Sequence, residues 1–219
     1  MDLFSPSEYF DLSAFEHASI FDNEGAVWQA LQRIGQYLAS HSLGNLEALI
    51  EPGAHLIHPK EISIGKGSVV EAGAYIRGPC LIGENCEIRH GAYIRGDVIV
   101  GNNCVIGHST EVKHSIFLDG AQVGHLSYVG DSILGNRVNL GAGTKCANLR
   151  FDHQPIMIHW KNRHISTEMR KLGAILGDDA QTGCNSVTNP GTLMGKGYCL
   201  APCTTAYGVI PAKYVKVSS

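Results

Sequence analysis

Residues 64–118 read IGKGSVVEAGAYIRGPCLIGENCEIRHGAYIRGDVIVGNNCVIGHSTEVKHSIFL, and an aliphatic residue recurs at every sixth position of this stretch. Neither an α-helix nor an isolated β-strand has a period of six. A fixed short repeat of this kind is typical of a hexapeptide β-helix, in which each short strand buries its apolar side against the turns above and below it. The ten positions are Ile64, Val70, Ile76, Ile82, Ile88, Ile94, Val100, Ile106, Val112 and Leu118.

A second slot of the repeat, four residues after each aliphatic position, holds small or β-branched residues that fit a tight inward corner. Its members are Ser68, Ala74, Cys80, Cys86, Ala92, Val98, Cys104, Thr110 and Ile116. After Leu118 the step shortens to five residues, at Val123. Because departures from a repeat tend to mark functional sites, we look for chemistry between residues 111 and 148.

Composition limits the class of protein. The chain has 219 residues, an apolar content of 44% and a net charge of −3, which allow a sizeable core and argue against a nucleic-acid or membrane-surface protein. It has no run of eighteen apolar residues, and its acidic start lacks the basic beginning of a signal peptide. We therefore expect a soluble cytoplasmic protein. No CxxC pair occurs, so we expect no metal site, and the cysteines of the inward slot should be reduced.

The chain divides into three parts. Residues 1–48 do not repeat and predict an N-terminal helical arm, with Asp22 and Asn23 as possible N-caps, that packs on the β-helix or on a neighbouring subunit. Residues 49–206 form the repeat domain of roughly seven turns, with a predicted hairpin insertion at 151–171, and residues 207–219 form a C-terminal tail. The apolar face of the arm helix holds Val27, Trp28, Leu31, Ile34 and Leu38.

Three segments go beyond the repeat: GHLSYVGD at 124–131, NLGAGT at 139–144 and ANLR at 147–150. Together they resemble the glucosamine-1-phosphate N-acetyltransferase family, whose acetyltransferase domain is usually fused to a sugar-1-phosphate nucleotidylyltransferase. The resemblance covers about residues 90–206, and the long insertion after ANLR is similar to archaeal-type members. It implies an all-β, left-handed parallel β-helix that forms a homotrimer, with active sites between adjacent subunits.

The resemblance also implies a reaction. Such an enzyme moves acetyl from acetyl-CoA to the amine of a hexosamine-1-phosphate, glucosamine-1-phosphate first, without a metal, and yields the precursor of a UDP-N-acetylhexosamine. The general base of the family falls on His125, and an imidazole with a reference pKa of about 6.5 suits proton removal at neutral pH. Glu111 is expected to orient or polarise that imidazole.

Phosphate recognition needs fixed cationic donors. Arg95 and Lys113 fall where the family holds the sugar phosphate, and they lie eighteen residues apart, one full turn, so they should stack on one side of the prism, with Arg77 extending the column. Tyr128 could add a hydroxyl to the phosphate. Lys171 aligns with a further phosphate-binding lysine of the family if the insertion is looped out.

The remaining site predictions concern the amine and the acyl donor. Asn139 and Asn148 are expected to hold the amine, the sugar hydroxyls or the acetyl carbonyl, with Asn148 favoured for polarising the thioester carbonyl. Cys184 stands where the family has a serine near the thioester. With Ala201 and Lys213 it is predicted to contact acetyl-CoA.

Other functions stay open at this stage. Leu149 and Gln154 depart from the family pattern, which favours a non-catalytic trimeric scaffold or partner of a separate nucleotidylyltransferase. His90, His108, His114 and His125 would suit a carbonic anhydrase of the hexapeptide class only at zinc geometry. A longer acyl donor is a further alternative. Residues 1–48 hold no glycine-rich nucleotide loop, so we do not expect the chain to make a nucleotide sugar alone: the arm is a remnant linker, or another protein supplies the uridylyltransferase step.

Overall fold

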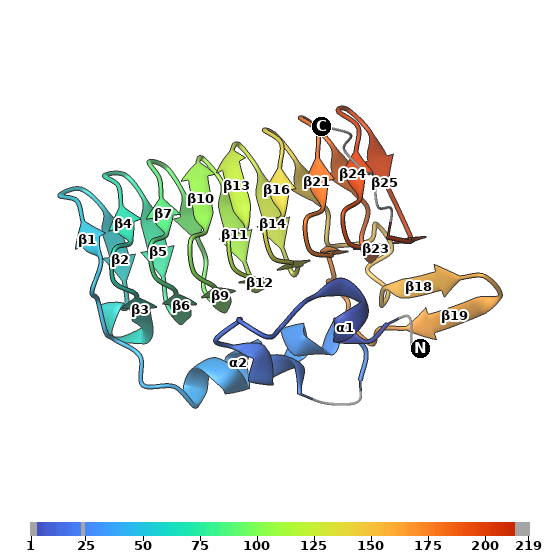
Figure 1. The fold of residues 1–219 in the computed structure, drawn as a ribbon, viewed down its shortest axis with the longest axis horizontal. Helices are drawn as coiled ribbons and strands as arrows, with labels where there is room; N and C mark the ends of the chain where they lie inside the picture. The colour runs from blue at the N-terminus through green and yellow to red at the C-terminus, as the bar shows by residue number, and fades with distance from the viewer. Residues whose placement is uncertain (1–3, 23–24, 213–219) are drawn as a thin grey trace.

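The computed structural model describes residues 4–22 and 25–212. Three parallel sheets of eight strands each wind into a prism, and successive strands occupy the three sheets in turn (Figure 1). Each strand has two to four residues, as the hexapeptide period requires. The predicted parallel β-helix is therefore confirmed, with eight strands per sheet rather than the roughly seven turns expected.

The three sheets are numbered by their first strands. Sheet 1 contains β1 (Leu49–Ile50), β4 (Val69–Val70), β7 (Glu87–Ile88), β10 (Val105–His108), β13 (Gln122–His125), β16 (Asn139–Leu140), β21 (Gln181–Thr182) and β24 (Cys199–Leu200). Sheet 2 contains β2 (His55–Ile57), β5 (Tyr75–Arg77), β8 (Tyr93–Ile94), β11 (Glu111–Lys113), β14 (Tyr128–Gly130), β17 (Lys145–Cys146), β22 (Val187–Thr188) and β25 (Thr205–Ala206). Sheet 3 contains β3 (Ile62–Ile64), β6 (Cys80–Ile82), β9 (Val98–Val100), β12 (Ser115–Phe117), β15 (Ile133–Leu134), β20 (Ala174–Leu176), β23 (Thr192–Met194) and β26 (Val209–Ile210).

All ten aliphatic residues of the repeat are buried, but Leu118 is buried outside the prism rather than in its interior. Val100 pairs with Phe117 rather than with Leu118, so Phe117 fills the interior of the prism. Leu118 belongs instead to the outer cluster beneath the arm. The shortened step therefore lies between Val112 and Phe117, one step earlier than the sequence suggested. The next shortened step lies between Val129 and Leu134.

The arm covers the outer face of sheet 3. It contains α1 (Pro6–Tyr9), the 3-10 helix η1 (Ala18–Phe21) and α2 (Gln29–Ala39), and its apolar face packs on Ile99, Ile116, Ile133, Ile175 and Leu193. The five residues of the predicted helical face are all buried, but Val27 and Trp28 precede α2.

The predicted N-cap is wrong. α2 begins after Trp28, which caps it without a side-chain hydrogen bond, while Asp22 ends η1. Asn23 lies outside the described residues. Burial of the apolar face, rather than a polar cap, therefore fixes where this helix starts.

A buried carboxylate joins the arm to the prism. Asp178 is 3% exposed, and its Oδ2 accepts the backbone N–H of Asp11 at 2.7 Å. Its Oδ1 accepts the backbone N–H of Asn136 at 2.8 Å and the side-chain amide of Asn136 at 2.9 Å. The same amide donates to the carbonyl of Asp11 at 2.8 Å. These bonds fix the chain after α1 against two turns of the β-helix.

The insertion is an antiparallel hairpin, as predicted. Its strands are β18 (Met157–Trp160) and β19 (Arg163–Ser166), and the hairpin stands off one end of the prism near the arm (Figure 1). Ile156 and Ile158 are buried in the cluster that the arm shares with sheet 3. Within the described residues, no helix has the length and apolar character needed to span a bilayer.

Candidate active site

The outer face of sheet 2 carries two polar columns. Tyr93, Glu111 and Tyr128 are in register on β8, β11 and β14. Arg95 follows β8 and lies beside Lys113, as the shared hydrogen bond between the Arg95 N–H and the Val112 carbonyl shows. The predicted stacking one turn apart is thus observed, because side chains two residues apart on a strand share a face. We call these five residues, Tyr93, Arg95, Glu111, Lys113 and Tyr128, the sheet 2 face.

Each cation of this face already has a carboxylate partner. Arg95 donates from Nη1 to Glu111 Oε1 at 2.6 Å, with side chains that are 44% and 34% exposed. The hydrogen bond to Glu111, with a smaller contribution from its charge, raises the pKa of Arg95. Glu111 therefore binds Arg95 in this chain, and the predicted contact with His125 is not formed. An ion pair this exposed contributes little to stability, so a ligand can displace it at low cost.

Lys113 lies beside a more buried carboxylate. Its Nζ is 2.7 Å from Asp131 Oδ2, and the Asp131 side chain is only 7% exposed. His114 Nδ1 lies 3.1 Å from Asp131 Oδ1, and the Asn148 amide donates to Oδ2. Burial disfavours the charged carboxylate, but the bonds from His114 and Lys113 outweigh that cost and hold the pKa of Asp131 below its ordinary value. Asp131 is therefore ionised at neutral pH.

The two shortened steps of the repeat create this cluster. His114 and Asp131 sit one turn apart at the corner between sheets 2 and 3, with φ angles of 44° and 49°. A five-residue step leaves only a tight corner, which places the two side chains against each other. Sequence reasoning missed both roles, although the broken period and the aspartate that ends GHLSYVGD were visible signals.

Tyr128 and Asn148 close the cluster toward the sheet 2 face. The Asn148 amide nitrogen lies 3.1 Å from the Tyr128 hydroxyl. Burial raises the pKa of Tyr128, so its hydroxyl stays protonated at neutral pH. Between them, a Cβ on Gly130 would lie 2.5 Å from the Tyr128 hydroxyl and 2.7 Å from the Asn148 amide nitrogen. A side chain at position 130 would therefore displace one or both of these side-chain ends.

His125 lies at the other edge of sheet 2, on the corner shared with sheet 1. It ends β13, is exposed and stands opposite His108 in the register. His90 and His108 stack one turn apart on the same corner, with ring planes 9° apart. Within the part of the chain that the structure describes, no side chain hydrogen-bonds the His125 imidazole. The imidazole is free to meet a ligand.

Two of the three predicted acyl-donor contacts share the corner of His125. The backbone carbonyl of Cys184 accepts a hydrogen bond from a backbone N–H of the next turn. The carbonyl of His125 makes the equivalent hydrogen bond two turns earlier in the prism. Both residues are exposed. Ala201 is exposed one turn further on. Lys213 lies outside the described residues. Asn139 begins β16, so it lies on the outer face of sheet 1, away from Asn148.

Lys171 comes next to Asn148 because the insertion is looped out, as predicted. Lys171 pairs with Leu149 in an antiparallel bridge, and the N–H of Leu172 donates to the Asn148 carbonyl at 3.0 Å. Lys171 is exposed. The hairpin thus returns a lysine to the edge of sheet 2 opposite His125.

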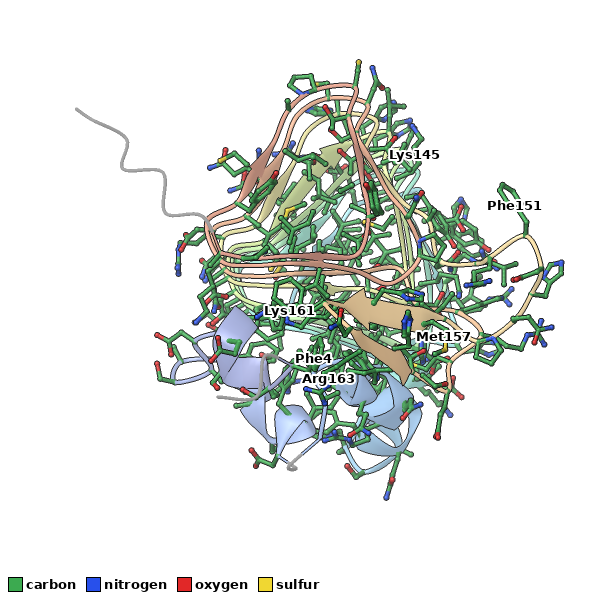
Figure 2. All side chains as sticks on the ribbon, turned by 90° about the vertical axis from the view of Figure 1, so that its right-hand side faces the viewer. Phe4, Lys145, Phe151, Met157, Lys161 and Arg163 are labelled. Carbon is green, nitrogen blue, oxygen red and sulfur yellow. The ribbon has the colours of Figure 1, made fainter. Side chains whose placement is uncertain are left out.

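A cavity of about 510 Å³ opens beside this edge, between sheet 2 and the loop that enters the hairpin. Leu149, Phe151 and Met157 contribute to its lining. Figure 2 looks along the prism and shows the loop with Phe151 standing off the side of the molecule that carries Lys145. Phe151 is fully exposed, so this loop has apolar surface that the single chain does not cover.

The cluster consists of polar and charged side chains that hydrogen-bond one another. Within residues 4–22 and 25–212, no group of three or more histidine, cysteine, aspartate or glutamate side chains is placed to hold a metal ion. The cysteines of the inward slot are buried and reduced, as predicted. Burial raises the pKa of Cys80 to about 12 and that of Cys146 to about 11, so both thiols stay protonated.

Fold and site together define a hexapeptide-repeat β-helix with a polar site on one flat side. Residues 62–77 match the model of the hexapeptide repeat of succinyl-transferase. Residues 76–196 match the model of the GMPPB C-terminal domain, which spans more than half of the chain. The chain belongs to the GMPPB C-terminal domain family.

Curated relatives confirm the resemblance drawn from the three segments. The bifunctional sugar-1-phosphate nucleotidylyltransferase/acetyltransferase of Sulfurisphaera tokodaii is 47% identical over 85 residues, which are 39% of this chain and 21% of that protein. The bifunctional protein GlmU of Methanococcus maripaludis strain C7 is 46% identical over 86 residues, 39% of this chain and 21% of that protein. The match thus spans about a fifth of the length of these relatives.

Solved structures add only a distant likeness. A hexapeptide transferase family protein from Anaplasma phagocytophilum is 19% identical with a TM-score of 0.41, over 78% of this chain and 80% of that one. The UDP-N-acetylglucosamine acyltransferase of Francisella novicida is 15% identical with a TM-score of 0.48, over 73% of this chain and 61% of that one. Scores this low carry no argument about function.

Proposed function

We propose that the chain is an N-acetyltransferase that moves acetyl from acetyl-CoA to the amine of a hexosamine-1-phosphate, glucosamine-1-phosphate first. The observation that carries the proposal is the sheet 2 face, which has a free imidazole at one edge and cations and polar amides toward the other. The acetyltransferase named in the relatives supports the same reaction. On this proposal the chain yields the precursor of a UDP-N-acetylhexosamine.

The reaction needs an amine that is neutral when it attacks. His125 accepts a proton from the amine as the nitrogen bonds to the thioester carbonyl carbon, and the carbon–sulfur bond then breaks. The proton leaves through the imidazole to the departing CoA sulfur. An imidazole with a reference pKa of about 6.5 can carry that proton in both directions at neutral pH.

The substrate phosphate meets the cations of the opposite edge. When the substrate binds, Arg95 releases its exposed ion pair with Glu111 and bonds to the phosphate instead. A phosphate accepts the same charge-assisted hydrogen bonds as a carboxylate and carries more negative charge. Lys171 adds a second cation beside Asn148. Acetyl-CoA runs along the corner of His125, past Cys184 and Ala201, toward the C-terminal turns.

A second copy of the chain completes the site in this proposal. The His125 corner is open to solvent, and Leu126 and Phe151 are exposed at the two edges of sheet 2. Flat sides of triangular prisms pack in closed rings, so we propose a homotrimer. A non-catalytic trimeric scaffold would share this assembly, and it differs from the enzyme only in turnover.

The test is release of CoA from acetyl-CoA, measured by chromatography because the exposed cysteines of this chain would react with a thiol reagent. We expect release to depend on an added hexosamine-1-phosphate. His125→Ala should lower kcat about 10²- to 10⁴-fold, the usual contribution of a general base.

The matched control is His90→Ala, which changes an exposed histidine of the same corner, two turns away, and should leave kcat unchanged. Full turnover by His125→Ala would show that His125 is not the general base. Absence of CoA release with every hexosamine-1-phosphate would favour the scaffold.

A further inference from the structure

Asp131 has no role in the mechanism above, yet it is the most connected carboxylate at the sheet 2 face. It is 5% exposed and takes bonds from Lys113, His114 and Asn148. A buried charge with three partners is costly to build, so its contacts should serve the site or the fold.

The charge of Asp131 decides how Asn148 presents its amide. An ionised carboxylate only accepts hydrogen bonds, so the Asn148 group that faces it must be the NH₂. The same nitrogen also lies 3.1 Å from the Tyr128 hydroxyl, which therefore accepts the second amide hydrogen. Both hydrogens of the amide are then used within the chain.

This arrangement leaves two groups of defined polarity that a ligand can use. Among the described residues, no donor reaches Asn148 Oδ1, which remains a free acceptor. The Tyr128 hydroxyl uses its oxygen to accept from Asn148, so its own hydrogen is free to donate. A free acceptor suits an amine N–H, and a free donor suits a phosphate or sugar oxygen. The sequence suggested that Asn148 polarises the thioester carbonyl. With both amide hydrogens engaged within the chain, Asn148 has none left to donate to that carbonyl.

We propose that Asp131 is a positioning residue that fixes the Asn148 amide with its oxygen toward the bound sugar, and that Lys113 serves chiefly to neutralise Asp131. The proposal rests on the proposed function, because it assigns the orientation of a group in the same site. Two features support it: Lys113 is 2.7 Å from the carboxylate, and the Asn148 amide donates both to that carboxylate and to the Tyr128 hydroxyl.

The test compares Asp131→Asn with the wild-type chain. The single oxygen of an amide at position 131 stays toward Lys113, so it can hold the Asn148 NH₂ only through a weaker, uncharged hydrogen bond, and the Asn148 amide is less firmly oriented. We expect kcat to fall about 10- to 100-fold, the scale of a small misplacement of a reacting group. Lys113 keeps its charge, so KM for the hexosamine phosphate should stay within about threefold.

The control is Asp179→Asn, which removes the exposed bond to Arg137 and should leave both parameters unchanged. A kcat within twofold of wild type would overturn the proposal. The proposal would also be overturned if Asp131→Asn lowered kcat/KM only through a higher KM for the sugar phosphate, because a general loss of substrate binding would then explain the effect.

A readout that needs no turnover separates this proposal from the proposed function. The side-chain amide protons of Asn148, assigned by their disappearance in Asn148→Ala, should exchange slowly with solvent in the wild-type chain. Asp131→Asn should speed that exchange, while Asp179→Asn should not. Rapid exchange of both protons in the wild-type chain would overturn the proposal even where Asp131→Asn does not fold.

Discussion

At the scale of single residues, the site depends on which polar groups are already satisfied within the chain. Lys113 and Arg95 looked equivalent in the sequence, one turn apart with the same charge. The structure separates them, because Lys113 is 18% exposed and bonds to a buried carboxylate, whereas Arg95 is exposed and bonds to an exposed one. Arg95 is therefore the cation that a ligand can recruit at low cost.

Arg95→Ala should raise KM for the hexosamine phosphate about 10- to 100-fold, the loss expected for hydrogen bonds to a charged group. KM for acetyl-CoA should not change, since Arg95 lies at the opposite edge of sheet 2 from the His125 corner. Initial-rate kinetics with each substrate varied in turn give both values.

Arg89→Ala serves as the control. Arg89 forms an equally short ion pair, 2.6 Å from Glu87, but follows a strand of sheet 1. Equal rises in both KM values for Arg95→Ala would refute a specific phosphate contact.

The residue scale also shows where sequence reasoning ends. The period-six pattern predicted most inward positions but wrongly placed Ile116 and Leu118 inside the prism, and the three segments predicted His125, Tyr128 and Asn148 as site residues. Neither predicted Asp131, because a hydrogen-bonded cluster depends on which turns stack, and the five-residue steps shift that stacking by one residue. Spacing placed Glu111 one turn after Tyr93, but it could not say which neighbour the carboxylate would bond, because the side-chain conformation decides that.

At the scale of elements, the arm and the hairpin are built onto one side of the prism. Strands of sheet 3 such as Val98–Val100 are buried on both faces because α2 and its neighbours cover them. The sequence predicted the arm helix and its apolar face but not which sheet it covers, since all three sheets share the same period. Covering sheet 3 leaves the sheet 2 face free.

Asp178→Ala should destabilise the chain by about 2–5 kcal/mol, because it leaves several buried donors without an acceptor. For a chain of this size that corresponds to a fall in Tm of roughly 5–15 °C. Thermal unfolding followed by circular dichroism measures it, and protease should cut the arm sooner.

The neighbouring Asp179→Ala is the control. Asp179 is 54% exposed, so its pair with Arg137 should contribute at most about 1 kcal/mol. Equal falls in Tm for the two variants would mean that the Asp178 bonds do not hold the arm to the prism.

At the scale of the whole molecule, we propose that the sheet 2 face binds a hexosamine phosphate with its phosphate toward Arg95 and its amine toward His125. In this proposal a neighbouring copy of the chain closes the site. The repeat alone predicts the fold class. It does not predict which of the three flat sides carries the candidate site, because that depends on the arm, the shortened steps and the hairpin.

The most direct measurement is a crystal structure with CoA and glucosamine-1-phosphate bound. We expect the amine nitrogen within about 3 Å of the His125 imidazole, which is hydrogen-bond reach for a general base. The phosphate should contact Arg95, and Asn148 Oδ1 should accept a hydrogen bond from the sugar. A sugar phosphate bound away from sheet 2, or a His125 ring that points away from the amine, would contradict the account.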